Sequence, residues 1–249
     1  MLWRTDAMVL DAATEIAARL DDAPHDHAAR TDDTTHTVAA AAIDLSGRVH
    51  VATNVFHFTG GPCAELAVLG AARAVSDDPV MTIVAVGDRG RGVLAPCGRC
   101  RQVLLDLQPQ ALVLVPGQAD GAPEAVPVRS LLPRAYAWPD APAPRVVRFN
   151  GRYRDAVLAG RKTATIRYDD PQGTGPTTFV FEDERAEGFT TTPALVTSVV
   201  RKRVADIDAD DARDEDAGTV ADLRAGLLGH YPQLRDEDEV DVARFSVRP

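Results

Sequence analysis

The chain has 249 residues, enough for one large domain or two small ones, and a hydrophobic fraction of 45% is sufficient for packed cores. Its formal net charge of −10 and its aromatic fraction of 5% disfavour general nucleic-acid binding, which needs basic grooves and stacking surfaces. No apolar run approaches membrane-spanning length, so we expect a cytoplasmic protein whose thiols stay reduced.

The first predicted element is a helix that Asp6 caps. Helical spacing predicts that its apolar face carries Met8, Ala12, Ile16 and Leu20. The polar segment 21–36 is expected to be a solvated loop. Its His25 and His27 are more typical of such a loop than of a metal site.

Apolar patterns and turn residues predict the other elements of the first half. They are strands 38–45 and 48–52 around Ser46-Gly47, a helix 63–74, a strand 81–86, a helix 97–107 and a strand 111–115. Both predicted helices after the hairpin begin at a cysteine.

All three cysteines fall within two short motifs, Cys63-Ala64-Glu65 and Pro96-Cys97-Gly98-Arg99-Cys100. Cys97 and Cys100 lie three residues apart, which puts both sulfurs on one side of a first helical turn, and Cys63 comes from elsewhere. Three protein ligands leave one tetrahedral position open, as in a catalytic Zn²⁺ site. Zinc lowers the pKa of bound water to about 7, and Glu65 can shuttle its proton.

A redox pair, or cysteines used as small hydrophobic residues, would also contain thiols at this spacing. The separate cysteine and glutamate upstream instead favour the zinc nucleobase deaminase signature, in which the glutamate is acid and base rather than ligand. Helix amino termini lower thiol pKa values, which helps to hold thiolates. Arg99 or Arg101 is close enough in sequence to donate to a sulfur.

The segment 139–144 is proline-rich and can continue neither a helix nor a central strand. It predicts domains 1–140 and 141–249. The expected elements after it are strands 145–149, 178–182, 195–203 and 240–247, a helix 153–159 that ends at Gly160, and a helix 220–228. Several strands with few helices indicate a small β-barrel.

From Thr37 to Trp138 the sequence resembles the blasticidin S deaminases of the cytidine deaminase superfamily, most closely over 54–66 and 96–107. The resemblance implies an α/β/α sandwich with a mixed sheet and a homotetramer. It also implies that Cys63, Cys97 and Cys100 hold Zn²⁺, and that Glu65 protonates N3 of a cytosine ring and relays protons to the departing ammonia.

The same resemblance implies a substrate pocket formed by Thr37, Asn54, Arg91, Tyr136 and Trp138. Thr37 stands where the antibiotic deaminases have serine, and Phe56 replaces their tyrosine. Arg91 could meet a sugar carboxylate or be an ordinary loop arginine. Trp138 could cover the pyrimidine ring or pack at the joint between the halves.

Phe56 bears on the choice between nucleoside and antibiotic. Ordinary cytidine deaminases carry Asn-x-Glu here to hold the ribose hydroxyls, and this chain has Asn54-Val55-Phe56. Loss of that acceptor could cost about 1.5 to 3 kcal/mol of hydrogen bonding to ribose. A substrate with a different sugar, such as blasticidin S, is therefore favoured over cytidine.

Residues from about 145 to 247 resemble the ASCH domain, a PUA-like family, through 160–167, Tyr231-Pro232 and the last strand. Members have been linked to RNA binding, and some resemble amidohydrolases of N4-acetylcytidine. The resemblance implies catalytic roles for Lys162 and Thr165, with Glu215 preferred over Asp216 as the acidic partner. A binding module with a polar groove is the alternative for this half.

The sequence thus predicts a zinc-dependent hydrolytic deaminase of a free cytosine nucleoside, with no membrane partner. Three alternatives remain. They are RNA binding, hydrolysis of an N4-acylcytidine by the second half, and a purely structural zinc site. The acidic net charge disfavours the first.

Overall fold

A computed structural model of the chain describes residues 2–21, 36–117, 122–136, 138, 145–182 and 188–247. It contains two compact units. Of the described residues, 145–182 and 189–247 form the second unit, and the others, Gly188 included, form the first. His25, His27 and the proline-rich segment 139–144 lie outside the described residues. None of the described helices has the length and apolar character that crossing a membrane requires.

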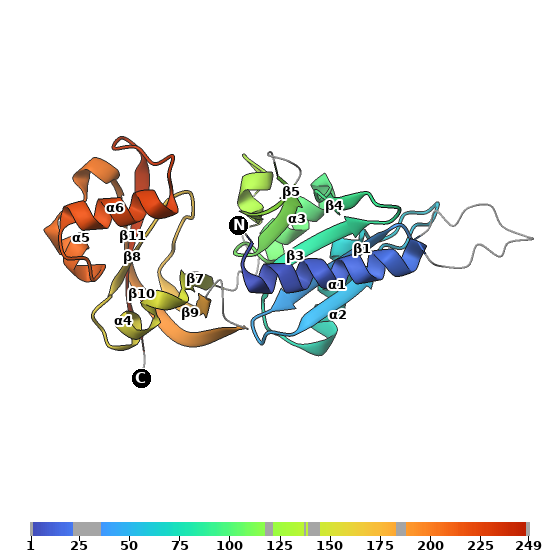
Figure 1. The fold of residues 1–249 in the computed structure, drawn as a ribbon, viewed down its shortest axis with the longest axis horizontal. Coiled ribbons are helices and arrows are strands. Elements are labelled where there is room, and N and C mark those ends of the chain that lie inside the picture. The colour runs from blue at the N-terminus through green and yellow to red at the C-terminus, as the bar shows by residue number, and fades with distance from the viewer. Residues whose placement is uncertain are drawn as a thin grey trace, which may run out of the picture. The chain divides into compact units, whose positions relative to one another are not determined.

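A mixed sheet in the order β2-β1-β3-β5-β6 forms the middle of the first unit (Figure 1). Its strands are β1 (Val38–Asp44), β2 (Val49–Thr53), β3 (Val80–Gly87), β4 (Gly92–Leu94), β5 (Leu112–Pro116) and β6 (Pro123–Pro127). β1 is antiparallel to β2 and β3, β3 is parallel to β5, and the short β4 pairs with the end of β3. Every residue of β3 is buried, as expected of a central strand with both faces covered.

Helices cover both faces of this sheet. They are α1 (Arg4–Asp21), α2 (Ala64–Val75) and α3 (Gly98–Leu107), with a short 3₁₀ helix, η1 (Val128–Leu131). Ile83 of β3 packs in one core cluster with Val68 of α2 and Leu104 of α3. The next side chain, Thr82, points to the opposite face and donates to Asp6 of α1 at 2.8 Å. The predicted α/β/α sandwich with a mixed sheet is confirmed.

The apolar face predicted for α1 is wrong. Val9, Ala13 and Ala17 are buried, whereas Met8 is 42% exposed, so the helix is rotated by one residue from the predicted face. Asp6 lies within the helix, where its carboxylate accepts from Thr82 and from the backbone N–H of Trp3. A buried carboxylate must be hydrogen-bonded, and this requirement sets the rotation more strongly than the hydrophobicity of Met8.

The second unit is a curled sheet in the order β7-β9-β10-β11-β8 (Figure 1). Its strands are β7 (Val146–Asn150), β8 (Ala164–Arg167), β9 (Gly175–Glu182), β10 (Phe189–Arg203) and β11 (Glu239–Val247). Its helices are η2 (Gly151–Tyr153), α4 (Arg154–Leu158), η3 (Val204–Asp206), α5 (Ala209–Asp214) and α6 (Val220–His230). The sequence did not predict β8 or α5 as separate elements.

The two edge strands of this sheet are joined by a side chain. Arg167 on β8 donates from Nη2 to the carbonyl of Arg148 on β7 at 2.7 Å. The expected small β-barrel is therefore a half-barrel. Phe149, Phe179 and Phe245 fill its interior, and α5 and α6 pack beside β8 and β11 through a second apolar cluster.

Candidate functional site

The ends of two helices bring the three cysteines together. Cys63 is the residue immediately before α2, Cys97 is the residue immediately before α3, and both have extended backbones. Their carbonyls accept the first helical hydrogen bonds, from Ala67 and Arg101, each at 3.0 Å. Cys100 lies in the first turn of α3 and is buried. The expectation that both motifs begin helices is met.

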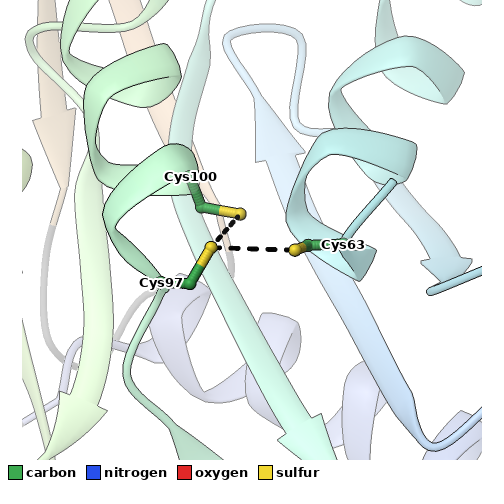
Figure 2. A group of neighbouring side chains, drawn as sticks. All are labelled: Cys63, Cys97 and Cys100. Atoms are coloured by element: carbon green, nitrogen blue, oxygen red, sulfur yellow. Dashed lines mark hydrogen bonds between the residues drawn. The ribbon is translucent and has the colours of Figure 1, made fainter. Parts of the chain in front are cut away.

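The three sulfurs are spaced as ligands of one tetrahedral ion. Cys97 Sγ lies 3.7 Å from Cys63 Sγ and 3.6 Å from Cys100 Sγ, and all three lie within 4.8 Å of one another (Figure 2). Zinc–sulfur bonds of about 2.3 Å at tetrahedral angles place two sulfurs about 3.8 Å apart. The residues therefore fit Zn²⁺, which is the cofactor of this site. Because Cys97 is exposed, the cluster is accessible from one side.

Glu65 lies in the first turn of α2, next to these thiols, and is only 6% exposed. Burial raises the pKa of its carboxyl group, and hydrogen bonds from its own backbone N–H and from the Cys100 thiol oppose that rise. Burial also raises the pKa of the Cys100 thiol. A carboxyl group that keeps its proton at higher pH than an ordinary glutamate is suited to general acid and base chemistry.

A tight loop places the end of β2 beside Cys63. Val55 N–H donates to the carbonyl of Pro62 at 3.1 Å. A Cβ atom on Gly61 would lie 1.8 Å from the Val55 carbonyl oxygen, so only glycine fits there. This contact holds the segment of Asn54 and Phe56 close in space to Cys63, the first zinc ligand.

Three of the predicted pocket residues contact one another. Asn54 Oδ1 accepts from the backbone N–H groups of Thr37 and Val38, both at 2.8 Å. Arg91 donates to the carbonyl of Thr37, and its Nη2 and Nε lie 2.5 and 3.0 Å from Asp88 Oδ1. Asp88 thus already supplies a carboxylate to Arg91, the group that a substrate sugar would supply under one of the two alternatives for this residue.

The other two predicted pocket residues, Tyr136 and Trp138, are exposed by 70% and 45%. Gln102 of α3 donates to the Tyr136 carbonyl at 3.0 Å, which ties this segment to the helix that follows Cys97 and contains Cys100. Either Arg99 or Arg101 was predicted to be close enough to donate to a sulfur, and Arg99 is exposed. Arg101 makes other contacts. Its Nε and Nη1 donate instead to the carbonyls of Pro96 and Leu131, at 2.7 and 3.0 Å, because a guanidinium fork can bridge two chain segments.

In the second unit, Lys162 and Glu215 form a buried pair. Lys162 is 2% exposed, and its Nζ donates to Glu215 Oε2. The other carboxylate oxygen accepts from the backbone N–H of Ile166 at 2.6 Å. Burial lowers the pKa of Lys162 and raises that of Glu215, and each partner's charge opposes the shift of the other. Asp216, the alternative acidic partner, instead lies 3.4 Å from Arg161.

Thr165 is buried on β8, and its hydroxyl accepts from Arg167 Nε at 3.1 Å. Lys162 precedes the strand, in the turn after α4, where its backbone N–H donates to the Ala156 carbonyl at 3.1 Å. The turn directs Lys162 toward Glu215.

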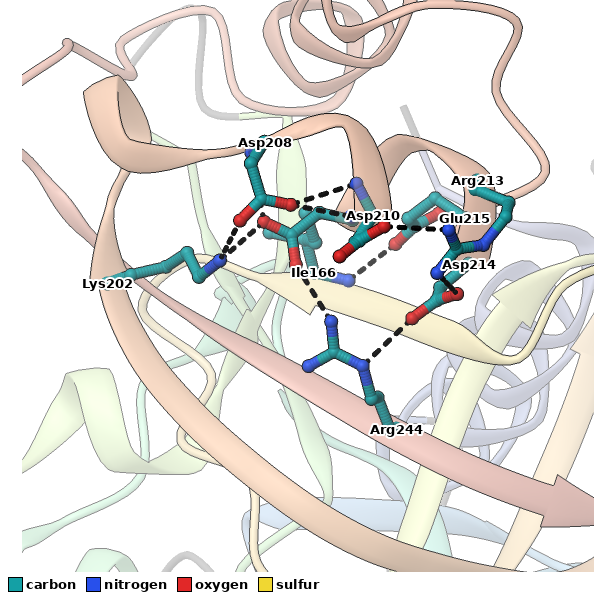
Figure 3. Close-up of polar contacts among 9 residues, drawn as sticks. Ile166, Lys202, Asp208, Asp210, Arg213, Asp214, Glu215 and Arg244 are labelled. Carbon is teal, nitrogen blue, oxygen red and sulfur yellow. Dashed lines mark hydrogen bonds and ion pairs between the residues drawn. The ribbon is translucent and has the colours of Figure 1, made fainter.

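Ion pairs fix α5, the short helix that Glu215 directly follows (Figure 3). Asp211 of α5 is fully buried, and its carboxylate lies 2.6 Å from Lys202 Nζ and 3.1 Å from Arg244 Nη2. Arg244 Nε also lies 2.9 Å from Asp214 Oδ2. Glu215 follows α5 directly, so these contacts position its carboxylate against β8.

Comparison with known proteins identifies the family. No protein-family model matches the chain. A cytidine deaminase of Mycobacterium tuberculosis is 36% identical over 107 residues, which cover 42% of this chain and 76% of that protein. The chain belongs to the cytidine deaminase family.

Two solved structures are each similar to part of this chain. The cytidine deaminase structure from Mycobacterium tuberculosis has 28% identity and a TM-score of 0.40, over 53% of this chain and 97% of that one. An ASCH domain structure from Lactobacillus crispatus has 14% identity and a TM-score of 0.35, over 41% of this chain and 79% of that one.

Some residues near the zinc site and near the Lys162–Glu215 pair were not predicted from the sequence. Asp88 holds Arg91, and Arg152, Tyr153 and His230 gather beside Lys162. His230 directly precedes Tyr231-Pro232, which is part of the ASCH-like pattern in the sequence. This position beside the pattern was the one local signal for His230.

Proposed function

We propose that the first unit is a zinc-dependent hydrolytic deaminase that converts the C4 amine of a free cytosine nucleoside to a carbonyl group. Water adds the oxygen and ammonia leaves. The observation that supports this most directly is the set of three sulfurs at zinc spacing, with the buried Glu65 beside them.

Bound zinc would supply hydroxide at neutral pH by lowering the pKa of water. The chain's own contribution is the proton traffic. Glu65, whose pKa burial raises, would give a proton to ring N3 and carry a second proton to the departing amine. Cys63 and Cys97, at the ends of two helices, would hold the metal at the open side of the site where the ring enters.

The test replaces Glu65 by Gln, which keeps the size and removes the acid and base. We expect the variant to retain one zinc per chain while kcat falls about 10²- to 10⁴-fold, the usual contribution of a general acid or base. Glu124→Gln, at an exposed position of β6, is the matched control and should leave kcat unchanged. Full activity of Glu65→Gln would reject the proposed role.

The preferred substrate in this proposal is blasticidin S ahead of cytidine. Phe56 supports it, because a phenyl ring cannot accept hydrogen bonds from ribose hydroxyls as a glutamate can. Arg91 adds less support, since Asp88 already pairs with it. A catalytic efficiency tenfold or more higher for cytidine than for blasticidin S would reverse the preference.

We further propose that the first unit assembles as a homotetramer. The loop before Cys63 exposes Val55, Phe56 and Phe58 by 46%, 60% and 87%, and clustered exposed apolar side chains are typical of interfaces. Light scattering of the full chain should give four times the mass of 26.6 kDa, and a monomer at micromolar concentration would contradict this.

A second activity is proposed for Lys162, Glu215 and Thr165: hydrolysis of the amide of an N4-acylcytidine. Lys162 is buried and its pKa is lowered, and the buried Thr165 hydroxyl follows three residues later. A lysine with a lowered pKa can act as the base that activates a hydroxyl nucleophile. Full-length protein should release acetate from N4-acetylcytidine, and Lys162→Ala should abolish the release. Release unaffected by that change would reject it, and salt-dependent binding of RNA oligonucleotides would favour the RNA-binding alternative.

A further inference from the structure

Three side chains from two helical segments meet beside the Lys162–Glu215 pair. Arg152 Nη2 lies 2.6 Å from Tyr153 Oη and 3.0 Å from His230 Nε2, and the Tyr153 and His230 atoms are 3.0 Å apart. Lys162 Nζ lies 5.0 Å from the centre of the Tyr153 ring. Arg152 and His230 are exposed, so a ligand can reach them.

This cluster has more positive than negative charge. Among the described residues, the guanidinium group of Arg152 makes its polar contacts with Tyr153 and the ring of His230, with no carboxylate within ion-pair distance. Elsewhere in this unit several cations pair with carboxylates, as Lys202 does with Asp211. In a chain with a net charge of −10, composition does not account for a local positive excess.

The charges that face His230 come from both neighbouring elements. Partial burial lowers the pKa of the His230 ring most, and the charges of Arg152 in η2, of Arg167 on β8 and of Lys162 in the turn before β8 lower it further. Glu215, the acidic group next to Lys162, already pairs with it. Partial burial and the surrounding positive charge thus both favour the neutral ring, whereas a bound anion would favour the protonated one.

We propose that Arg152, Tyr153 and His230 form a binding site for a phosphate monoester, such as the phosphate of a mononucleotide. A guanidinium group, a phenol hydroxyl and an imidazole ring supply several donors to one tetrahedral oxyanion, and arginine matches phosphate geometry with two parallel bonds. A dianion also matches the positive charge of Arg152 plus that of a protonated His230. This inference does not depend on the deaminase proposal, because it concerns the other unit.

The experiment is calorimetric titration of the full-length, zinc-loaded chain with inorganic phosphate. Arg152→Gln and His230→Gln each remove one anion partner, and Tyr153→Phe removes only the hydroxyl. Arg154→Gln is the matched control. It removes the same charge as Arg152→Gln, two residues further along the chain, and the Arg154 side chain lies near Asp155. Thermal unfolding of each variant checks that the fold is intact.

We expect phosphate to bind the wild-type chain and its dissociation constant to rise about tenfold or more in Arg152→Gln and His230→Gln, against less than about twofold in the control. Nuclear magnetic resonance should show the His230 pKa rising on saturation with phosphate, since binding offsets the cations. Cytidine 5′-monophosphate should displace phosphate, and cytidine should not.

Three results would overturn the proposal. They are no phosphate binding at millimolar concentration, an equal loss of affinity in Arg154→Gln, and an unchanged His230 titration. Displacement of phosphate by an RNA oligonucleotide but not by the monophosphate would assign the site to nucleic acid instead.

Discussion

The buried pair of Lys162 and Glu215 makes a quantitative prediction about stability. Their side chains are 3% and 11% exposed, so solvent screens the pair little. Removing one partner of a buried pair costs about 3 to 5 kcal/mol, because the other charge stays buried without compensation. Lys162→Met and Glu215→Gln should each lose about this much, and both substitutions nearly conserve side-chain volume.

Glu215→Leu should lose more than Glu215→Gln. The Glu215 carboxylate also accepts from the Ile166 backbone N–H, and a glutamine oxygen can keep that bond while leucine cannot. A buried N–H left without an acceptor costs about a further 1 to 3 kcal/mol.

The two single variants should depend on pH in opposite directions. Burial raises the pKa of Glu215, and Lys162→Met removes the larger of the two positive charges that oppose this rise, while Arg167 remains. A group with a raised pKa contributes stability that is lost as pH rises through its folded value, so Lys162→Met should lose more stability above a glutamate's ordinary pKa of about 4.3. Burial lowers the pKa of Lys162, so Glu215→Gln should lose more stability as pH falls below a lysine's ordinary pKa of about 10.4.

The assay is urea unfolding between about pH 5 and 9, followed by hydrogen exchange of peptides from β8 and β11 so that the signal reports the second unit. Arg161→Gln, which breaks an exposed pair with Asp216, is the control and should cost less than about 1 kcal/mol at every pH. Losses below about 1 kcal/mol for Lys162→Met, or the same pH trend in both variants, would refute the reasoning.

Three further changes test the deaminase unit. Gly61→Ala should lower zinc content as measured by metal analysis, because its Cβ would collide with the Val55 carbonyl and displace the segment that ends at Cys63. Asn54→Ala should lower the free energy of unfolding by about 1 to 3 kcal/mol or more, since it leaves two backbone N–H groups without their acceptor; an unchanged urea midpoint would argue against this. Phe56→Glu should raise the ratio of kcat/KM for cytidine over blasticidin S by about tenfold or more, the equivalent of one charged hydrogen bond, and a falling ratio would contradict the ribose argument.

The zinc site was predictable because its chemistry is encoded locally. Cys97 and Cys100 are one helical turn apart, Glu65 is two residues from Cys63, and the chain has no cysteine outside these two motifs. Only the approach of the two helix ends required the fold. The metal and its ligands could therefore be predicted from local spacing, whereas the α/β/α layers were predicted from the family resemblance.

What failed depended on contacts between distant residues. The rotation of α1 is set by a hydrogen bond between Asp6 and Thr82, which are 76 residues apart. Arg91 donates to the carbonyl of Thr37, 54 residues away, and the partners of Arg152 include His230, 78 residues away. Charge pairs of this kind leave no periodic signal, so the positive cluster beside Lys162 emerged only from the structure.

The central claim is that Cys63, Cys97 and Cys100 hold a catalytic zinc. Its most direct test removes the metal with a chelator, restores it in steps, and measures ammonia release from cytidine and blasticidin S at each zinc occupancy of the full-length chain. We predict activity on at least one of the two compounds that rises in proportion to zinc and stops rising at one zinc per chain. Activity that persists without zinc, or a fully loaded protein inactive on both compounds, would contradict the account.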